Sequence, residues 1–466
     1  MMPTHHTLRA VLLLGTSLFW SQLVWCNAKP DREKEPSPHT WFATNPIFEG
    51  RVYLEEWGDP AKPAILLVHG LGNNGAKDWR HLAPLLSTAF HVITFDLPGF
   101  GRSSKVDALY SPDNYARFVD WVAASYAKKP FILVGHSMGG VIALTYATQH
   151  PDKLKQLILI NVAGVLHRAA FSKYLVNKYK SYWWSHLIPD TEQLDRQFGV
   201  GIGEIDRFDT AFNLILTNSF TRQIALGGDP AKIAGLAMVQ KDFSGLLEQV
   251  TPPTTIIWGA QDTIAPLRTG QMLAYRLPNA RLEIIPEAGH SPMHETREQL
   301  NATVWESITR PSVPTPPKKR INDDTVPIKE ERCVKQTERY YSGRYHHLIL
   351  EGCQQVTLEN ATVDHLQLID STVAIYNSAI GTGERALTAL RSTVFATAAT
   401  FDAEIPLAVD DTQLDFAGVD IRARQQLFKS RLKSYAIFSL STVTGPQSRE
   451  HRHGVYPIPL TVTPQQ

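Results

Sequence analysis

The stretch Phe131–Gly140 constrains the fold of this chain more than any other. Its first four residues are apolar and predict a strand buried on both faces, and the apolar run Val141–Ala147 predicts a helix. Between them lies the pattern G-x-S-x-G, with Ser137 at its centre. A sharp turn from strand to helix strains the backbone of the middle residue, and the flanking glycines leave room for that turn. The pattern therefore predicts a nucleophilic serine raised above the end of a sheet.

Strands and helices are predicted to alternate around this stretch, from Trp41 to Thr309. The other predicted strands are Arg51–Trp57, Ala64–Val68, His91–Phe95, Gln156–Asn161, Thr254–Gly259 and Arg281–Ile285. The other predicted helices are Asp78–Leu86, a helix capped by Ser111 and Pro112, Pro266–Arg276 and Glu295–Thr309. Buried strands that alternate with helices are typical of an α/β fold with a mostly parallel sheet covered on both faces.

The alternation is interrupted between Ala163 and Val250. This segment has apolar residues at helical spacing and is rich in aromatic side chains: Phe171, Tyr174, Tyr179, Tyr182, Trp183, Trp184, Phe198, Phe208, Phe212 and Phe220. Inserted between two sheet strands, it is expected to fold as a helical cap, about residues 163–250. Most of the aromatic side chains are expected to be the core of the cap. Those that face the cleft, for which Trp183 and Trp184 are the candidates, predict an apolar substrate pocket.

Five motifs, in this order, resemble those of the α/β-hydrolase family. They are His69-Gly70-Leu71-Gly72, Asp96-Leu97-Pro98-Gly99-Phe100-Gly101, Gly135-His136-Ser137-Met138-Gly139-Gly140, Trp258-Gly259-Ala260-Gln261-Asp262 and Gly289-His290-Ser291. The order of nucleophile, acid and histidine is that of the family. The resemblance covers about residues 43 to 309 and implies a hydrolase domain with a cap; it does not extend to the last hundred and fifty residues.

A catalytic triad of Ser137, Asp262 and His290 is expected from these motifs. A serine hydroxyl is a poor nucleophile near neutral pH, so a base must take its proton, and His290 follows the last predicted strand. Asp262 would fix the tautomer of His290 and stabilise the imidazolium. The backbone N–H groups of Leu71 and Met138 are the candidate oxyanion hole.

Other polar residues near the motifs are given structural roles. His136 is expected to pack and hydrogen-bond within the strand-to-helix turn around Ser137, called the elbow below. His69 is expected to shape the loop that carries the Leu71 N–H. Asp96 and Arg102 are expected to hold a loop together. His294, one turn after His290 on a predicted helix, is given no catalytic role.

The charge balance gives no indication of a strongly basic surface on this chain that would bind an acidic partner. The 466 residues include 46 basic and 45 acidic side chains, for a net charge of +1, so no nucleic-acid binding is predicted. The expected chemistry needs no cofactor, and none is predicted. The triplet His451-Arg452-His453 has no carboxylate or cysteine framework, so it is interpreted as exposed tail and no metal site is predicted.

The first residues, 1–28, are interpreted as a secretory signal. His5, His6 and Arg9 precede an apolar run from Ala10 to Trp20, and small residues favour cleavage after Ala28. We therefore expect export to the periplasm or the medium. A lipid anchor through Cys26 is the less favoured alternative, because Trp25 is too bulky for the preceding position.

The composition changes after Thr309. Residues 311–332 are rich in proline and predict an extended linker. Residues 333–466 contain short apolar runs (Leu348–Leu350, Val356–Leu358, Leu366–Leu368 and Val373–Ile375) that predict a β-rich domain, either a parallel β-solenoid or a small sandwich. Its expected role is to bind a surface or protein partner. Cys333 and Cys353 remain after export, and an oxidising compartment favours a disulfide between them.

The sequence therefore predicts an exported hydrolase domain, residues 29–310, with a β-rich domain appended. Because the nucleophile is Ser137, we do not expect the activities of family members that use an aspartate at this position, which open epoxides or displace halide. The favoured substrate is a small ester with an apolar acyl or alkyl part. Carbon–carbon bond hydrolysis, amide hydrolysis and acyl transfer stay open, as does a receptor that binds a ligand without catalysis.

Overall fold

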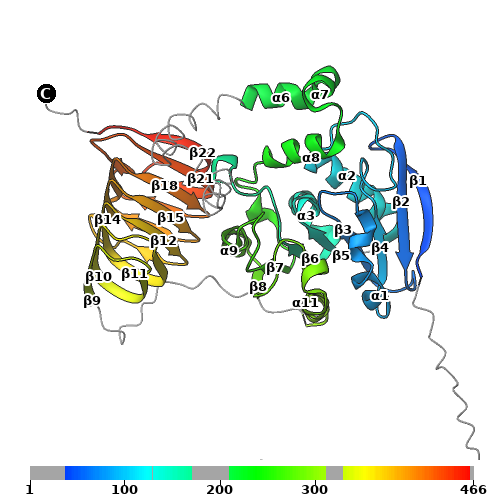
Figure 1. The fold of residues 1–466 in the computed structure, drawn as a ribbon, viewed down its shortest axis with the longest axis horizontal. Helices are drawn as coiled ribbons and strands as arrows, with labels where there is room; N and C mark the ends of the chain where they lie inside the picture. The colour runs from blue at the N-terminus through cyan, green and yellow to red at the C-terminus, as the bar shows by residue number, and fades with distance from the viewer. Residues whose placement is uncertain (1–36, 128–129, 171–208, 311–328, 462–466) are drawn as a thin grey trace, which may run out of the picture. The chain divides into compact units, whose positions relative to one another are not determined.

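An eight-stranded sheet forms the centre of the N-terminal domain (Figure 1). The computed structural model describes residues 37–127, 130–170, 209–310 and 329–461. The strand order is β1-β2-β4-β3-β5-β6-β7-β8, in which β1, β2 and β4 pair antiparallel and the other pairs are parallel. The bounds are β1 His39–Asn45, β2 Gly50–Trp57, β3 Ala64–Val68, β4 His91–Phe95, β5 Phe131–His136, β6 Leu154–Ile160, β7 Thr254–Gly259 and β8 Ala280–Ile285. The mostly parallel α/β-hydrolase sheet predicted from the sequence is confirmed.

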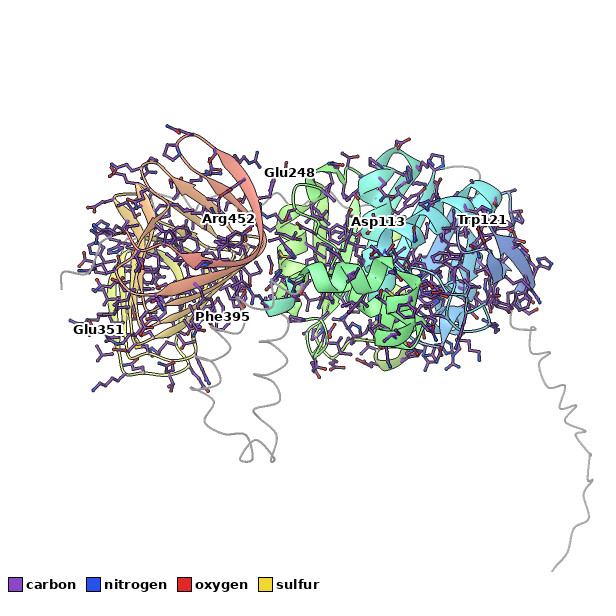
Figure 2. The ribbon with its side chains drawn as sticks, turned by 90° about the horizontal axis from the view of Figure 1, so that it is seen from above. Asp113, Trp121, Glu248, Glu351, Phe395 and Arg452 are labelled. Carbon is purple, nitrogen blue, oxygen red and sulfur yellow. A yellow bond between two sulfur atoms is a disulfide. The ribbon has the colours of Figure 1, made fainter. Side chains whose placement is uncertain are left out.

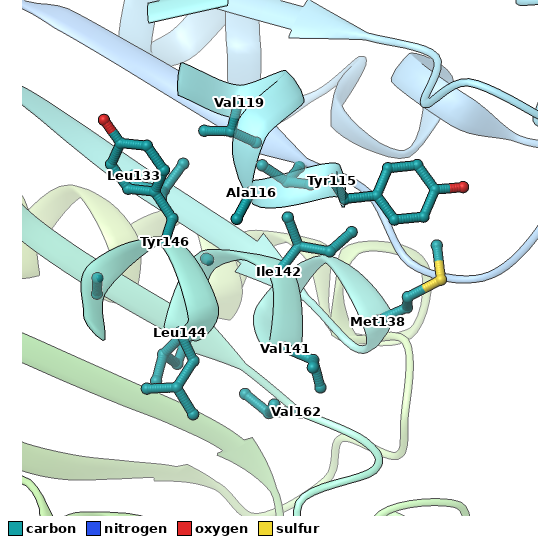
Figure 3. Close-up of a cluster of buried hydrophobic side chains, with 14 of the residues drawn as sticks. Tyr115, Ala116, Val119, Leu133, Met138, Val141, Ile142, Leu144, Tyr146 and Val162 are labelled. Atoms are coloured by element: carbon teal, nitrogen blue, oxygen red, sulfur yellow. The ribbon is translucent and has the colours of Figure 1, made fainter. Parts of the chain in front are cut away.

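Helices cover both faces of this sheet because successive strand residues point to opposite sides. Leu66 and Val68 of β3 belong to the core cluster under α2 (Pro112–Val122), α3 (Met138–Gln149) and α9 (Leu267–Arg276). Ile65 and Leu67 belong to the cluster under α1 (Leu82–Ser87) and α11 (Arg297–Thr309). Figure 3 shows Ala116 and Val119 of α2 with Ile142 of α3 in the first of these clusters.

Two predicted helices begin at other residues in the structure. The predicted range Asp78–Leu86 overlaps the end of a short 3-10 turn, η1 (Gly75–Trp79), and most of α1. Proline lacks an N–H and fits only the first turn of a helix, so Pro84 requires α1 to begin near Leu82. The helix predicted from about Glu295 to Thr309 is α11, which begins at Arg297. Thr296, whose φ of −135° is not helical, separates it from the short α10 (Pro292–Glu295).

Three helices follow β6 in the described part of the insertion. They are α6 Asp209–Thr217, α7 Ser219–Leu226 and α8 Pro230–Val239. Asn218 and Asp229 cap α7 and α8 by accepting backbone N–H groups, and proline occupies the first turn of α8. Trp183, Trp184 and most of the other aromatic residues predicted for the cap lie in residues 171–208, outside the described residues.

The C-terminal domain is β-rich, as predicted, and its strands pair mainly in parallel (Figure 1). Thr372 pairs with Thr393, Thr393 with Gln413, and Gln413 with Tyr435, so successive turns of the chain lie one above another. The strands are β9 Lys329–Val334, β10 Tyr340–Glu351, β11 Val356–Ile369, β12 Thr372–Tyr376, β13 Ala379–Ile380, β14 Arg385–Leu390, β15 Thr393–Thr397, β16 Thr400–Ala403, β17 Ile405–Asp410, β18 Gln413–Ala417, β19 Asp420–Ala423, β20 Phe428–Lys429, β21 Ser434–Thr444 and β22 Arg449–Ile458.

Buried hydroxyl groups hydrogen-bond from one turn of this domain to the next. The N–H of Ser371 donates to Oγ of Ser392 (3.2 Å), that of Ser392 to Oγ1 of Thr412 (3.4 Å), and that of Thr412 to Oγ of Ser434 (3.1 Å). All four residues are buried. A buried backbone donor without a partner is costly, so this ladder satisfies the N–H groups where the strands end.

The predicted linker, residues 311–332, is too long at its C-terminal end. Strand β9 begins at Lys329 because it pairs in parallel with β10, where Cys333 lies opposite Leu350. Cys333 and Cys353 form a disulfide with a Cα–Cα distance of 6.5 Å. Arg332 donates to both carboxylate oxygens of Glu351, at 2.8 and 2.7 Å; Glu351 is labelled in Figure 2.

The interpretation of His451-Arg452-His453 as exposed tail is wrong. These residues lie in β22, which pairs antiparallel with β21. The guanidinium of Arg452, labelled in Figure 2, lies 5.0 Å from the ring centre of Tyr456 and 5.6 Å from that of Phe438. The N–H of Leu440 donates to Nδ1 of His453 (3.3 Å). Strand pairing and aromatic packing thus order a segment whose composition resembles a tail.

Two arginines of α9 form ion pairs with carboxylates of the C-terminal strands. Arg268 donates to both carboxylate oxygens of Asp415 (3.1 Å each), and Arg276 lies 2.8 Å from Asp420. The Arg268–Asp415 pair is largely buried, so removing one partner would leave an uncompensated charge. Within the described ranges, no helix combines the length and the apolar character needed to cross a membrane.

Candidate active site

The elbow between β5 and α3 holds Ser137 in a strained conformation. Its φ of 53° and ψ of −117° lie in a region that side chains other than glycine rarely adopt. A Cβ on Gly135 would lie 2.2 Å from the carbonyl oxygen of Gly139, and one on Gly139 would lie 2.2 Å from that of Val68. The two glycines are therefore required for the close approach of β5, α3 and β3 that raises Ser137.

The structure brings the three predicted triad residues together. Nε2 of His290 lies 2.9 Å from Oγ of Ser137, and Nδ1 of His290 lies 2.8 Å from Oδ2 of Asp262. Ser137 and Asp262 are buried, and the His290 side chain is largely so. The three side chains come from the ends of β5, β7 and β8, because the carboxyl ends of neighbouring parallel strands meet at one edge of the sheet.

Asp262 is held in its ionised form by several donors. Its Oδ1 accepts the N–H groups of Ile264 (2.7 Å) and Ala265 (2.8 Å), and its Oδ2 accepts Nδ2 of Asn161 (2.6 Å). Burial by itself would raise the pKa of this carboxyl. The hydrogen bond and charge of His290, with the donors of Asn161 and Ala265, outweigh burial and lower the pKa below its usual value.

Asn161 is a positioning residue that sequence reasoning missed. Besides its bond to Asp262, its Nδ2 donates to the carbonyl of Gly289 (3.1 Å), so one side chain ties the acid to the histidine loop. Its φ is 45°, a left-handed conformation that asparagine tolerates better than most residues. The available signal was its place directly after β6, at the same sheet edge as the triad.

Glu295 was also missed. Its carboxylate accepts the N–H groups of Gly289 and of Ser291, the residues on either side of His290. A Cβ on Gly259 would lie 2.2 Å from the carbonyl of Gly289, so the acid loop and the histidine loop are in direct backbone contact. In the sequence, nothing about a carboxylate five residues after His290 indicates that it accepts hydrogen bonds from the backbone of that loop.

The loop His69–Gly72, predicted to supply one oxyanion donor, lies against the nucleophile. A Cβ on Gly70 would be 3.0 Å from the Cβ of Ser137. His69 is fixed by two contacts, Nδ1 with the carbonyl of Gly70 (2.7 Å) and Nε2 with the N–H of Leu97 (2.8 Å). Leu71 follows Gly70 directly, and Met138 follows Ser137 and begins α3, so the loop that carries the first candidate donor approaches the residue that precedes the second.

His136 forms a structural contact with the histidine loop. Its Nε2 lies 2.8 Å from the carbonyl oxygen of His290. Burial, with the nearby His290, lowers the pKa of His136 to about 4, so its ring is neutral at neutral pH. Through this hydrogen bond it supports the backbone of His290.

The remaining residues singled out in the sequence have structural contacts. Oδ2 of Asp96 accepts the N–H and Nε of Arg102 (2.7 Å each), and its Oδ1 accepts the N–H of Ala76 (2.7 Å), which holds the loop as predicted. Nε2 of His294 lies 3.0 Å from Oδ1 of Asp78 and joins α10 to η1.

Comparisons with known proteins agree with this fold. A family model described as the alpha/beta hydrolase fold matches residues 63–193. The uncharacterized hydrolase YugF of Bacillus subtilis is 27% identical over 273 residues, 55% of this chain and 94% of that protein. 2-Hydroxy-6-oxononadienedioate/2-hydroxy-6-oxononatrienedioate hydrolase 1 of Pseudomonas putida is 26% identical over 264 residues, 55% of this chain and 92% of that protein. A solved structure of a thermophilic esterase from Thermogutta terrifontis is 22% identical with a TM-score of 0.42, and covers 59% of this chain and 98% of that one.

The elbow, the sheet order and the family model matched over residues 63–193 identify the N-terminal domain as an α/β-hydrolase fold. It is a hydrolase of that fold, to which a β-rich domain is attached.

Proposed function

We propose that this protein is a serine hydrolase that cleaves an ester with an apolar acyl or alkyl part. The observation that carries the proposal is the hydrogen-bonded chain from Ser137 through His290 to Asp262, at 2.9 and 2.8 Å. Such a chain is the arrangement that activates a serine hydroxyl for attack on a carbonyl carbon.

The proposed reaction has two halves. Oγ of Ser137 attacks the carbonyl carbon while Nε2 of His290 takes the hydroxyl proton, and Asp262 stabilises the resulting imidazolium. The oxyanion accepts hydrogen bonds from the backbone N–H groups of Leu71 and Met138. The tetrahedral intermediate then collapses, and the alkoxide leaves with the proton of His290. Water, deprotonated by the same histidine, hydrolyses the acyl-enzyme.

The apolar substrate class is supported by the composition of the insertion. The insertion is rich in aromatic residues, which suit an apolar acyl group better than a polar one. We propose Trp183 and Trp184 as substrate-binding residues of the cap. Amide hydrolysis and acyl transfer to another alcohol use the same machinery and are less favoured, because no residue in the sequence points to an amine or a second alcohol.

Hydrolysis of a carbon–carbon bond is the second candidate. It is favoured by the relative from Pseudomonas putida, whose name gives a 2-hydroxy-6-oxo dienedioate as its substrate. A parallel assay distinguishes the two activities. Loss of the dienedioate's absorbance, with no release of p-nitrophenol from esters, would favour the second candidate over the first.

The test of the ester proposal is the variant Ser137→Ala. We expect turnover of short p-nitrophenyl esters to fall by orders of magnitude. The residual rate should be roughly 10³-fold above uncatalysed hydrolysis in water, the level that the oxyanion hole and substrate binding alone supply. Ser342→Ala, an exposed serine of the C-terminal domain, is the control and should retain full activity. Undiminished activity of folded Ser137→Ala would refute the mechanism. An inert wild-type protein that binds a hydrophobic ligand tightly would favour the receptor alternative.

We also propose that the protein is exported and that its C-terminal domain is a β-solenoid that contacts a surface or protein partner. Export is supported by the signal pattern of residues 1–28, which lie outside the described residues, and by the cysteine pair. The solenoid is supported by the parallel pairing of successive turns. Mass spectrometry of the N-terminus of protein recovered from the periplasm or medium tests export; the expected first residue is Lys29.

A further inference from the structure

Two adjacent histidines point outward from the same side of β10. Side chains normally alternate along a strand, so His346 and His347 would be expected on opposite faces. The register of β10 against β9 shifts between Tyr345 and His347, and the alternation of buried and exposed residues is broken there. Both histidines are exposed, whereas Tyr345 and Leu348 on either side are buried. This break in alternation leaves both imidazole rings on the exposed surface of the strand.

Neighbouring strands add polar side chains to the same surface. Glu330 of β9 and His365 of β11 both lie opposite His347 in the parallel ladder. Nδ1 of His347 lies 3.8 Å from Oε1 of Glu330, and the rings of His346 and His347 are stacked with centres 4.4 Å apart. One candidate ligand atom from each of Glu330, His346 and His347 lies within 4.8 Å of the other two.

A carboxylate supports the first histidine. Nδ1 of His346 lies 2.9 Å from Oδ2 of Asp364 on β11. With the proton on Nδ1 and donated to Asp364, Nε2 of His346 carries the free lone pair. Metal-bound histidines commonly have such a carboxylate on their second ring nitrogen. His365 has a different role, because its Nε2 is engaged with Oγ1 of Thr388 at 2.9 Å.

We propose that Glu330, His346 and His347 bind a divalent transition-metal ion, with Zn²⁺ as the best fit and Asp364 as the group that orients His346. Two imidazoles and a carboxylate, with water as the fourth ligand, are a ligand set that Zn²⁺ accepts. Ca²⁺ and Mg²⁺ prefer oxygen ligands and fit this set poorly. Tetrahedral zinc needs ligand atoms about 3.3 Å apart, which exposed side chains reach by rotation from the spacing observed.

The ion would join β9 to β10. Strand β9 is the first strand of the C-terminal domain, and within the described residues it pairs with β10 alone. The disulfide Cys333–Cys353 holds one end of β9, and a metal bound through Glu330 would hold the other. A ligand that binds only the folded state stabilises it, so the ion should raise the melting temperature of this domain.

The test is calorimetric titration of the metal-free full-length protein with ZnCl₂. We expect one saturable site per chain, with MgCl₂ giving no saturable heat. The double variant His346→Ala/His347→Ala should bind at least 100-fold more weakly, and Asp364→Asn about 10- to 100-fold more weakly. His39→Ala is the matched control: this histidine is also exposed and lies 3.7 Å from a carboxylate, Glu56. The other histidine on that carboxylate, His91, is buried, so the site does not offer two exposed imidazoles.

Co²⁺ gives a second readout, since a tetrahedral site with nitrogen ligands produces visible absorption bands. Wild type and His39→Ala should show the bands, and the double variant should not. Circular dichroism confirms that each variant is folded, and Glu330→Gln replaces the double variant if that one unfolds. Unchanged Zn²⁺ affinity in the folded double variant, or no saturable binding to wild type at millimolar Zn²⁺, would overturn the proposal.

Discussion

Replacing Asn161 tests whether the hydrogen bonds behind Asp262 contribute to activity. Its side chain donates to Oδ2 of Asp262 at 2.6 Å and to the carbonyl of Gly289 at 3.1 Å. A hydrogen bond to a charged group contributes about 1.5–3 kcal/mol. If that energy supports the transition state, its loss lowers kcat/KM about 10- to 100-fold, since about 1.4 kcal/mol corresponds to a factor of ten.

Two substitutions separate the side chain from the backbone. Asn161→Gly removes the amide and tolerates the left-handed φ of 45°, whereas Asn161→Ala removes the same amide and strains the backbone. Both variants should lose activity by the same factor. The alanine variant should also be less stable than the glycine variant by about 1 kcal/mol, measured by urea denaturation.

The pH dependence gives a further check with a defined sign. The Asn161 donor helps to lower the pKa of Asp262, so its removal should raise that pKa. A carboxyl whose pKa is lower in the folded than in the unfolded protein stabilises the fold at pH values above its unfolded-state pKa. This stabilisation is lost as the pH falls through the folded-state pKa. Wild type should therefore lose more stability on acidification than Asn161→Gly.

The assay is the rate of p-nitrophenyl butyrate hydrolysis, together with the second-order rate of labelling by a fluorophosphonate. The labelling rate does not depend on knowing the natural substrate. Folded Asn161→Gly with wild-type rates in both assays would refute the argument that this amide positions Asp262. Equal stability of the glycine and alanine variants would refute the argument about backbone strain.

Three further predictions concern stability, the elbow and the cap. Cys333→Ser/Cys353→Ser should lower the free energy of unfolding of the C-terminal domain by about 3 kcal/mol while keeping esterase activity; unchanged denaturation would contradict this. Gly139→Ala places a Cβ 2.2 Å from a β3 carbonyl and should abolish soluble expression or labelling; normal labelling would show that the elbow tolerates the methyl group. Trp183→Ala/Trp184→Ala should alter acyl chain-length preference, each methylene contact being worth about 1–3 kcal/mol; equal loss on every chain length with a lowered Tm would mean that both tryptophans are core.

The sheet could be predicted because its strands carry their signal locally. Ala64–Val68, His91–Phe95 and Thr254–Gly259 are continuous apolar or β-branched runs, and the structure has strands with the same bounds. The triad residues follow such strands, so their order and their places in loops were sufficient to bring them to one sheet edge. Helix bounds were less accurate where one residue, such as Pro84, decides where the helix begins.

The residues that support the site could not be predicted because their partners are far away in the chain. Asn161 contacts a carboxylate 101 residues later, and its own neighbours in sequence give no sign of that contact. The histidines of β10 were missed for a related reason. Regular alternation would separate His346 from His347, and the break in alternation that exposes both lies where the register of β10 against β9 shifts.

The most direct test of the central claim is to locate the residue that a fluorophosphonate labels. A fluorophosphonate reacts with a serine only where a base and an oxyanion hole activate the hydroxyl. Peptide mass spectrometry of labelled wild type should place the adduct on Ser137, with no adduct in Ser137→Ala and a strongly reduced yield in His290→Ala. An adduct on another serine, or full labelling without His290, would contradict the account.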